Sequence, residues 1–340
     1  MELDVGGLTA RADRACKAWT AGASIASVTP LLGGASSLTY LAAVADAPPG
    51  SERVVLKVAP PGVKPVANRD VLRQARLLAA LADVPGLALP RVLFQDAGAP
   101  VEVPPFFAMS FAPGDSFDPH LDAPGDPRPA RLPGAADTNA RALSAARMLA
   151  VLHSVRPEDK GLGDEPEISL EAEVARWVKI FTTVDDDLKP GSEEIGAALS
   201  QSIPAAVPSC LTHGDYRLGN TLCVGGQVTA VIDWEIWSRG DPRLDLAWFL
   251  LTADPEVHPS ATRDAPGMPR SEVLKAEYEA AIGREMGDLS WFRALVLFKL
   301  ASASALIAKH KRRSGDPNGE GARAAGQIST MLGRARAHLN

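Results

Sequence analysis

The chain has 340 residues, 46 % apolar and 22 % charged, so we expect a globular protein of about two structural units. The 35 basic and 41 acidic residues give a net charge of −6, which argues against a dedicated nucleic-acid-binding protein. The three cysteines are scattered and match neither a disulfide framework nor a CxxC zinc site, so we expect a reducing, cytoplasmic location.

The first ~110 residues have the pattern of a small α+β unit. The expected elements are a hairpin over residues 28–45 with Gly33-Gly34 at its turn, a strand over 53–59, a helix over 66–83 and strands over 91–96 and 106–111. The last of these segments, FFAMSF, is apolar almost throughout, which favours burial on both faces.

Residues 112–135 are rich in Pro, Gly and Asp, which indicates a linker or surface loop. Beyond them the chain is mostly helical, with helices expected at 137–154, 168–184, 192–202, 243–253, 271–284, 288–313 and 320–338. An island of two short β runs, joined at Gly225-Gly226, interrupts the helices at 211–235.

No segment has the pattern of a signal peptide or a membrane span. The N-terminus carries Glu2 and Asp4 and lacks an apolar core. The most apolar long stretch, residues 294–308, contains Lys299 and is shorter than the about 20 residues that a membrane helix needs. We therefore interpret it as a buried helix and expect no membrane partner.

The island carries groups suited to phosphoryl transfer. It contains HGDYRLGN, then the hairpin, then IDWE. Phosphoryl transfer needs a carboxylate to orient and deprotonate the acceptor hydroxyl, and Asp215 has that place. Magnesium prefers hard oxygen ligands, which Asn220 and Asp233 supply at the following turn and at a returning strand end. Arg217 adds a cation to stabilise the charge of the transferred group.

These motifs resemble those of the aminoglycoside-phosphotransferase-like kinases, the small-molecule branch of the protein-kinase-like fold. The HGDxxxxN motif with a DWE segment thirteen residues beyond its Asn is specific, and the GDPRLDLA segment at 240–247 extends the resemblance. Within the family, the chain is most similar to the acyl-CoA-dehydrogenase-10-like subgroup, of which some members are associated with hydroxyacyl-CoA phosphorylation.

The resemblance implies a bilobal α+β fold: a β-rich nucleotide lobe with one main helix over residues 1–109, a hinge over 110–116 and a mainly helical lobe with the acceptor site over 117–340. It implies Mg²⁺ and ATP or GTP as co-substrates. By position, Asp215 matches the catalytic base, Asn220 and Asp233 the magnesium ligands, and His213 and Asp245 the residues that brace the catalytic loop. Gly33, Gly34 and Ser36 match the phosphate-covering turn, Lys57 the phosphate-binding lysine, and Ser110 and Ala112 the adenine-binding hinge.

Two positions depart from the family pattern. Ser37 stands where the family usually has Asn. Gln74 stands where a glutamate would pair with Lys57, and a neutral amide binds a lysine more weakly than a carboxylate does. Asp70 lies one turn earlier on the same helical face and is the alternative partner.

The acceptor stays open at this stage. A hydroxyl of a small molecule is expected, on a hydroxyacyl-CoA or another metabolite; an aminoglycoside kinase and a non-catalytic pseudokinase are the alternatives. Two acidic runs, at 115–126 and 185–187, would suit a polycation, or are simply solvated. The basic residues 309–313 would suit coenzyme A phosphates, or complement a helix C-terminus. We interpret the tryptophans near the motif as core residues before surfaces that stack on a substrate; they are Trp234, Trp237 and Trp248. We expect a monomer or homodimer.

Overall fold

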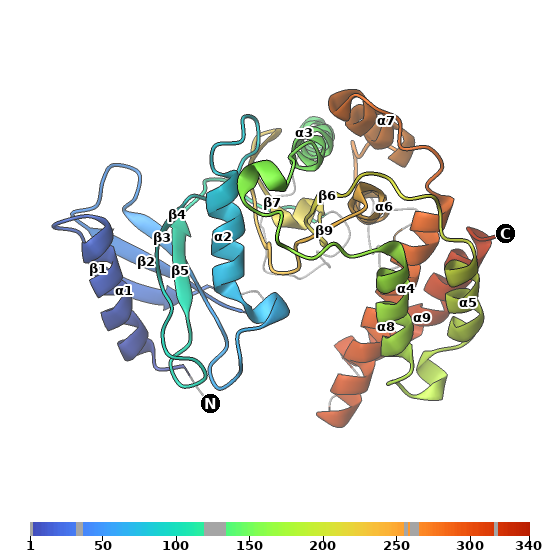
Figure 1. Ribbon diagram of the computed structural model, residues 1–340, viewed down its shortest axis with the longest axis horizontal. Helices are drawn as coiled ribbons and strands as arrows, with labels where there is room; N and C mark the ends of the chain where they lie inside the picture. The colour runs from blue at the N-terminus through green and yellow to red at the C-terminus, as the bar shows by residue number, and fades with distance from the viewer. Residues whose placement is uncertain (1–2, 32–36, 119–133, 255–257, 259–264, 316–318) are drawn as a thin grey trace.

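The protein has two lobes, one built around a β-sheet and one mainly helical (Figure 1). The computed structural model describes residues 3–31, 37–118, 134–254, 258, 265–315 and 319–340. The helix-rich second lobe and the sheet-bearing first lobe confirm the α+β class expected from the sequence. Strand β5 of the first lobe ends at Ser110, and the division at residues 109 and 116 stays a prediction.

The smaller lobe is a five-stranded sheet with strand order β1-β2-β3-β5-β4, in which every neighbouring pair is antiparallel. Its strands are β1 (Ser24–Pro30), β2 (Leu38–Ala45), β3 (Arg53–Val58), β4 (Val92–Asp96) and β5 (Phe106–Ser110). Strands β2 to β5 lie within the expected segments, whereas β1 begins four residues before the expected hairpin; Phe106–Met109 are buried on both faces as predicted. The turn with Gly33 and Gly34 lies outside the described residues.

Two helices, α1 (Val5–Trp19) and α2 (Val71–Leu81), cover the two faces of this sheet. Side chains alternate between the faces of a strand. Thus Phe106 and Ala108 of β5 share a core with α1, whereas Phe107 and Met109 share a core with α2 and the helical lobe. The α2 face of the sheet is therefore continuous with the larger lobe, and the α1 face is not.

Helix α1 was not among the elements expected from the sequence. It begins at Asp4, whose Oδ1 accepts a hydrogen bond from the Gly7 amide at 2.9 Å. Leu8, Ala12 and Cys16 follow at four-residue spacing and are all buried. This capped, short apolar stripe is the signal that indicates the helix.

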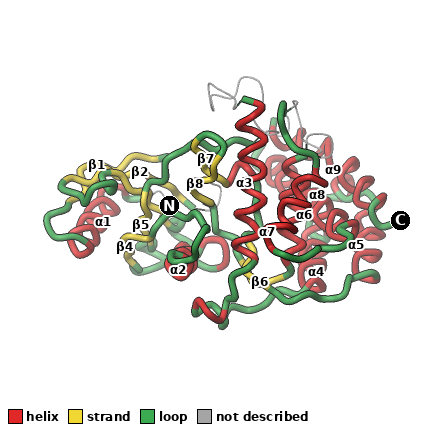
Figure 2. The backbone as a smooth tube through the Cα atoms, turned by 90° about the horizontal axis from the view of Figure 1, so that it is seen from above, coloured by secondary structure: helices red, strands yellow, loops and turns green. Residues whose placement is uncertain are grey.

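The larger lobe carries two small β ladders among its helices (Figure 2). Its helices are α3 (Ala135–His153), α4 (Leu170–Phe181), α5 (Ser192–Gln201), α6 (Pro242–Ala253), α7 (Ser271–Ile282), α8 (Ser290–Arg313) and α9 (Glu320–Ala337). Strand β6 (Cys210–Thr212) pairs with β9 (Ser238–Gly240), and β7 (Thr221–Val224) forms a hairpin with β8 (Gln227–Val231). All seven expected helices of this lobe are confirmed within three residues at each end, whereas β9 was not expected.

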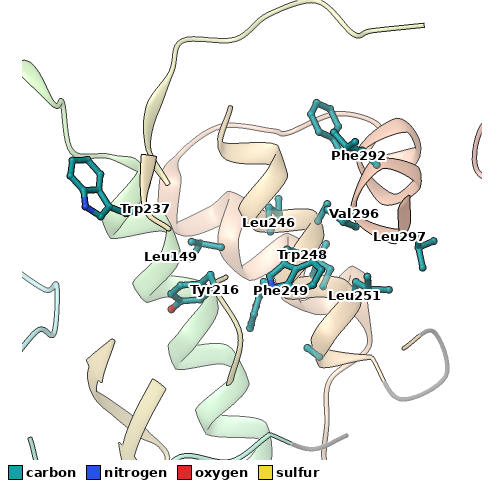
Figure 3. Packing of buried hydrophobic residues seen from close by; sticks show 14 of the residues in the cluster. Leu149, Tyr216, Trp237, Leu246, Trp248, Phe249, Leu251, Phe292, Val296 and Leu297 are labelled. Carbon is teal, nitrogen blue, oxygen red and sulfur yellow. The ribbon is translucent and has the colours of Figure 1, made fainter. Parts of the chain in front are cut away.

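Helix α8 is the central core helix of the larger lobe. Its side chains Phe292, Val296 and Leu297 lie beside Leu246 and Leu251 of α6 (Figure 3). Of the described helices, it alone has the length and apolarity that could span a bilayer, but 67 % of its most apolar window is buried within the protein. The prediction of a buried helix over residues 294–308 is confirmed.

The segment between the lobes is fastened to the β7–β8 hairpin. Asp115 exchanges two backbone hydrogen bonds with Cys223, at 2.9 and 3.0 Å. Gly114 precedes it at φ +123°, and a Cβ there would lie 2.6 Å from the Cys223 carbonyl oxygen. Only glycine fits this approach. Arg141 of α3 then binds the Asp115 carboxylate with both terminal nitrogens.

The role of α1 can be tested by truncating its buried face. Leu8→Ala should lower the free energy of unfolding by about 2–5 kcal/mol, because it opens a cavity between α1 and the sheet. Val5→Ala, on an exposed position of the same helix, is the matched control and should change it by less than about 0.5 kcal/mol. Urea denaturation measures both, and equal losses would show that α1 does not pack as described.

Candidate functional site

The chain turns sharply directly after β6, at His213-Gly214-Asp215. Gly214 has φ +85°, and a Cβ at this position would lie 2.6 Å from the backbone oxygen of Ile236. A side chain is therefore excluded by both the backbone conformation and the space. This explains in physical terms why a glycine lies between the histidine and the aspartate of the motif.

Asp245, in the first turn of α6, anchors this loop from below. Its carboxylate accepts the backbone N–H groups of His213, at 2.5 Å, and of Gly214, at 2.8 Å. The ring of His153 lies 3.3 Å from the same carboxylate. Burial alone would raise the pKa of Asp245, but the hydrogen bonds from the His153 ring and from the His213 backbone hold it below its ordinary value.

His213 is buried within the loop and bonds at both ring nitrogens. Its Nδ1 accepts the Asp215 N–H at 3.2 Å, so Nε2 carries the proton that is donated to the Ile232 carbonyl at 2.9 Å. The ring packs on Trp234 with centroids 4.5 Å apart. His213 thus lies within the loop that carries Asp215, and Asp245 contacts that loop.

The Asp215 carboxylate is held by three donors. Oδ1 accepts the indole N–H of Trp248 at 2.8 Å, and Oδ2 accepts the Asn220 amide at 2.9 Å and Arg217 Nε at 3.4 Å. The Asn220 amide also bonds the Asp215 carbonyl. Trp248 is as buried as the sequence suggests, but it is also a direct partner of the expected base, which sequence spacing did not indicate.

Arg217 is directed at carboxylates. It hydrogen-bonds Asp118 as well as Asp215. Although burial lowers the pKa of a guanidinium, these two carboxylates raise the pKa of Arg217 above its ordinary value. Its expected role in stabilising the transferred phosphoryl group stays a prediction, and its contact with Asp118, two residues beyond the expected hinge, was not foreseen.

Asn220 and Asp233 fit a magnesium site. The Ile232 N–H donates a hydrogen bond to the Asn220 carbonyl at 2.9 Å. This bond brings Asp233, the residue after Ile232, close to Asn220. The Asn220 amide nitrogen is used by Asp215, so its Oδ1 is the atom left for a metal. Asp233 has φ +68°, a conformation that Asp tolerates better than most residues, and its carboxylate contacts Lys57 of the other lobe. One carboxylate and one amide oxygen are the hard ligands that Mg²⁺ takes when phosphates complete its shell.

Lys57 reaches this site from β3 of the other lobe. Its ammonium lies 3.4 Å from Asp233 Oδ1 and 3.1 Å from Ser37 Oγ. The expected pairing with Gln74 or Asp70 is not made among the described residues. Asp70 instead caps α2 by accepting the Arg73 N–H at 3.0 Å. Gln74 is buried, and its amide nitrogen has no hydrogen-bond partner.

The remaining expected nucleotide contacts lie at the edge of the described structure. Gly33, Gly34 and Ser36 lie outside the described residues. Ser110 ends β5, where its N–H donates to the Arg91 carbonyl and its hydroxyl accepts the Arg91 N–H. Ala112 follows in the segment that leads to Gly114. Their binding of adenine stays a prediction.

A cavity lies beside the catalytic loop, between α4, α8 and the β6–β9 ladder. Its wall includes Gly214 and Ile236, and its charged side chains include Glu173 and Arg176 of α4 and Lys299 of α8. Glu173 accepts the Trp177 indole N–H at 2.7 Å and lies 3.8 Å from Arg176. The sequence analysis noted Lys299 only as a charge within an apolar helix.

Of the three charged clusters that the sequence analysis weighed for substrate binding, residues 185–187 and 309–313 contact each other, and most of residues 115–126 lie outside the described residues. Arg312 binds the carboxylates of Asp185 and Asp187. Lys309 donates to the Thr183 carbonyl in the same loop. Residues 185–187 and the basic end of α8 therefore join α8 to the loop after α4. Because these charges satisfy one another, neither cluster supports a substrate assignment.

Comparisons with known proteins agree with this geometry. A sequence model of the phosphotransferase enzyme family matches residues 27–284. Curated relatives include acyl-CoA dehydrogenase family member 10 of Mus musculus, 28 % identical over 64 % of this chain and 20 % of that protein. Family member 11 of Rattus norvegicus is 27 % identical over 74 % of this chain and 33 % of that protein. The chain thus spans a fifth to a third of the length of these relatives.

Solved structures share the fold. A Ralstonia eutropha protein that has been proposed to be an aminoglycoside phosphotransferase superposes with a TM-score of 0.79 at 22 % identity, covering 99 % of this chain and 98 % of that one. The aminoglycoside phosphotransferase APH(4)-Ia, in complex with AMP-PNP and hygromycin B, gives 0.59 at 16 % identity, covering 95 % and 98 %. These matches confirm the expected kinase-like fold.

The anchoring role of Asp245 has a pH signature. Asp245→Asn should lower the free energy of unfolding by about 3–5 kcal/mol at pH 7, because it breaks a buried charged network. A folded-state pKa below the unfolded value gives stability that is present above about pH 4 and lost as the pH falls through the folded pKa. The gap between wild type and variant, measured by urea denaturation, should therefore narrow below about pH 4. A gap that stays constant down to pH 2 would contradict the assignment.

Proposed function

Because the chain belongs to the phosphotransferase enzyme family, we propose that it transfers the γ-phosphoryl group of ATP or GTP to a hydroxyl of a small molecule in the presence of Mg²⁺. The observation that carries the proposal is the convergence of four side chains where the two lobes meet: Asp215, Asn220, Asp233 and Lys57. Three of them come from a single loop and hairpin, and the fourth crosses from the other lobe.

Each group has one task. Asp215, fixed by Trp248 and Asn220, orients the acceptor hydroxyl and accepts its proton. Asn220 and Asp233 would hold magnesium, which when bound neutralises charge on the phosphates. Lys57 donates hydrogen bonds from its ammonium to the α- and β-phosphates. Positioning and electrostatics account for most of the catalysis in this reaction class.

We propose that the acceptor is an anionic or neutral metabolite, with a hydroxyacyl-CoA as the first candidate. The cavity beside the loop that carries Asp215 is lined by two cations, Arg176 and Lys299, and by two carboxylates, Glu173 and Asp245, so it has no excess of negative charge to attract a polycation. The curated relatives named after acyl-CoA dehydrogenases support an acyl-CoA link. Structural neighbours below 25 % identity support the fold and leave the acceptor open. The cytoplasmic location and a monomeric or homodimeric state stay predictions from the sequence.

The metal assignment is tested by Asp233→Asn. Asparagine also tolerates positive φ, so the backbone should be retained while the charged metal ligand is lost. We expect magnesium-dependent nucleotide turnover to fall at least about 100-fold. Asp186→Asn is the control: it changes a fully exposed carboxylate outside the site and should keep full activity. Full activity of Asp233→Asn at low magnesium would refute the assignment.

The acceptor class is tested by an ATP-consumption screen of hydroxyacyl-CoAs, hydroxy acids, sugars, choline-like amines and aminoglycosides. We expect anionic or neutral acceptors to give a higher kcat/KM than kanamycin-type amines, since the two cations beside the loop balance its two carboxylates and leave no net negative charge for a polycation. Efficient phosphorylation of kanamycin with no turnover of any acyl-CoA would reverse this order. A nucleotide-dependent thermal shift without turnover of any acceptor would instead favour the pseudokinase alternative.

A further inference from the structure

Lys299 projects from the apolar helix α8 onto the catalytic loop. Its ammonium donates a hydrogen bond to the Gly214 carbonyl at 2.6 Å. It also lies 4.5 Å from the centroid of the Trp248 ring, within the range of a cation–π contact. Trp248 in turn donates its indole N–H to Asp215. Lys299 thus contacts both the residue before the base and the side chain that holds the base.

The peptide unit between Gly214 and Asp215 is held at both of its polar atoms. Its oxygen accepts from Lys299, and its N–H donates to His213 Nδ1 at 3.2 Å. A planar peptide with both ends fixed cannot rotate. Since the orientation of this peptide sets the direction in which the Asp215 side chain leaves the backbone, the two bonds aim the carboxylate.

Burying the Lys299 ammonium costs desolvation free energy, and good packing of α8 does not require a charge at this position. Burial lowers the pKa of Lys299 below its ordinary value, while the carboxylates of Glu173, Asp215 and Asp245 oppose that shift. The guanidinium of Arg176 also faces it and adds to the lowering. An apolar side chain at this turn of α8 would avoid the desolvation of a charge.

We propose that Lys299 and Trp248 are positioning residues for the catalytic base: Lys299 fixes the peptide that carries Asp215, and Trp248 fixes its carboxylate. Neither residue needs to touch the transferred phosphoryl group. The inference rests on the proposed function, because Asp215 acts as a base only if the chain transfers a phosphoryl group. It also makes a claim about contacts that can be measured without turnover.

The kinetic test compares Lys299→Met and Lys299→Arg with wild type, using the best acceptor from the screen. Misplacing the base should lower kcat about 10- to 100-fold in Lys299→Met and leave the KM for ATP within about twofold. Lys299→Arg keeps the charge and donors and should recover most of the loss. Arg293→Met, which removes a half-buried cation from the same helix but on its far side, is the control and should keep wild-type kcat.

Trp248→Phe keeps an aromatic ring but removes the pyrrole part of the indole, and with it the N–H donor. It should also lower kcat, and combining it with Lys299→Met should cost less than the product of the two single losses, because both act through Asp215. Unchanged kcat in Lys299→Met, or a full multiplicative loss in the double variant, would overturn the proposal. If Lys299→Met does not fold, Lys299→Gln and Trp248→Phe form the same cycle.

A second measurement uses the indole N–H resonance of Trp248, assigned by its loss in Trp248→Phe. We expect Lys299→Met, and not Arg293→Met, to shift this resonance and speed its exchange with solvent, because the loop that presents Asp215 is released. An unshifted resonance would overturn the positioning role even where activity falls. Absence of turnover by the wild-type chain would instead count against the proposed function, and the resonance would still decide the contact.

Discussion

The buried carboxylate of Asp245 is the constraint on which the site depends. Its carboxylate accepts the backbone N–H groups of both His213 and Gly214. These bonds join the start of α6 to the loop directly after β6, where strand pairing has ended. A buried carboxylate is costly unless its lone pairs are used, and here two amides and the His153 ring use them. The position of Asp215 follows from this bond and from the one residue shape, glycine, that the turn permits.

The helical lobe holds the segment that carries Asp215 in place. Helix α6 supplies Asp245 and Trp248 one turn apart on the same face, so a single helix fixes both the backbone and the side chain of the catalytic segment. The core between α6 and α8 keeps the two helices in register (Figure 3). The sheet lobe adds Lys57 from a strand in the middle of its sheet, with neighbours on both sides.

The sequence was informative where chemistry depends on short spacing. The motif from His213 to Asp233, the strands around Lys57 and the helices of the larger lobe were all predicted, because each is written in local pattern or in one loop. The contacts that were not predicted join distant segments. Trp248 is 33 residues from Asp215, and Asp118 is 99 residues from Arg217. Partner choice at such distances depends on how helices pack, which neither periodicity nor residue type specifies.

The polar network around Asp215 also bears on whether the site is catalytic or a remnant. Stability alone is usually served as well by apolar side chains as by buried charges, because desolvation offsets much of the attraction. Here Arg217, Asn220 and Trp248 each donate a hydrogen bond to one carboxylate, and Lys299 and His213 bond the peptide that precedes it. Such hydrogen bonds add little to the free energy of unfolding, but they fix the position of the two Asp215 carboxylate oxygens. Precise placement of a carboxylate is what the proposed transfer to a hydroxyl would require.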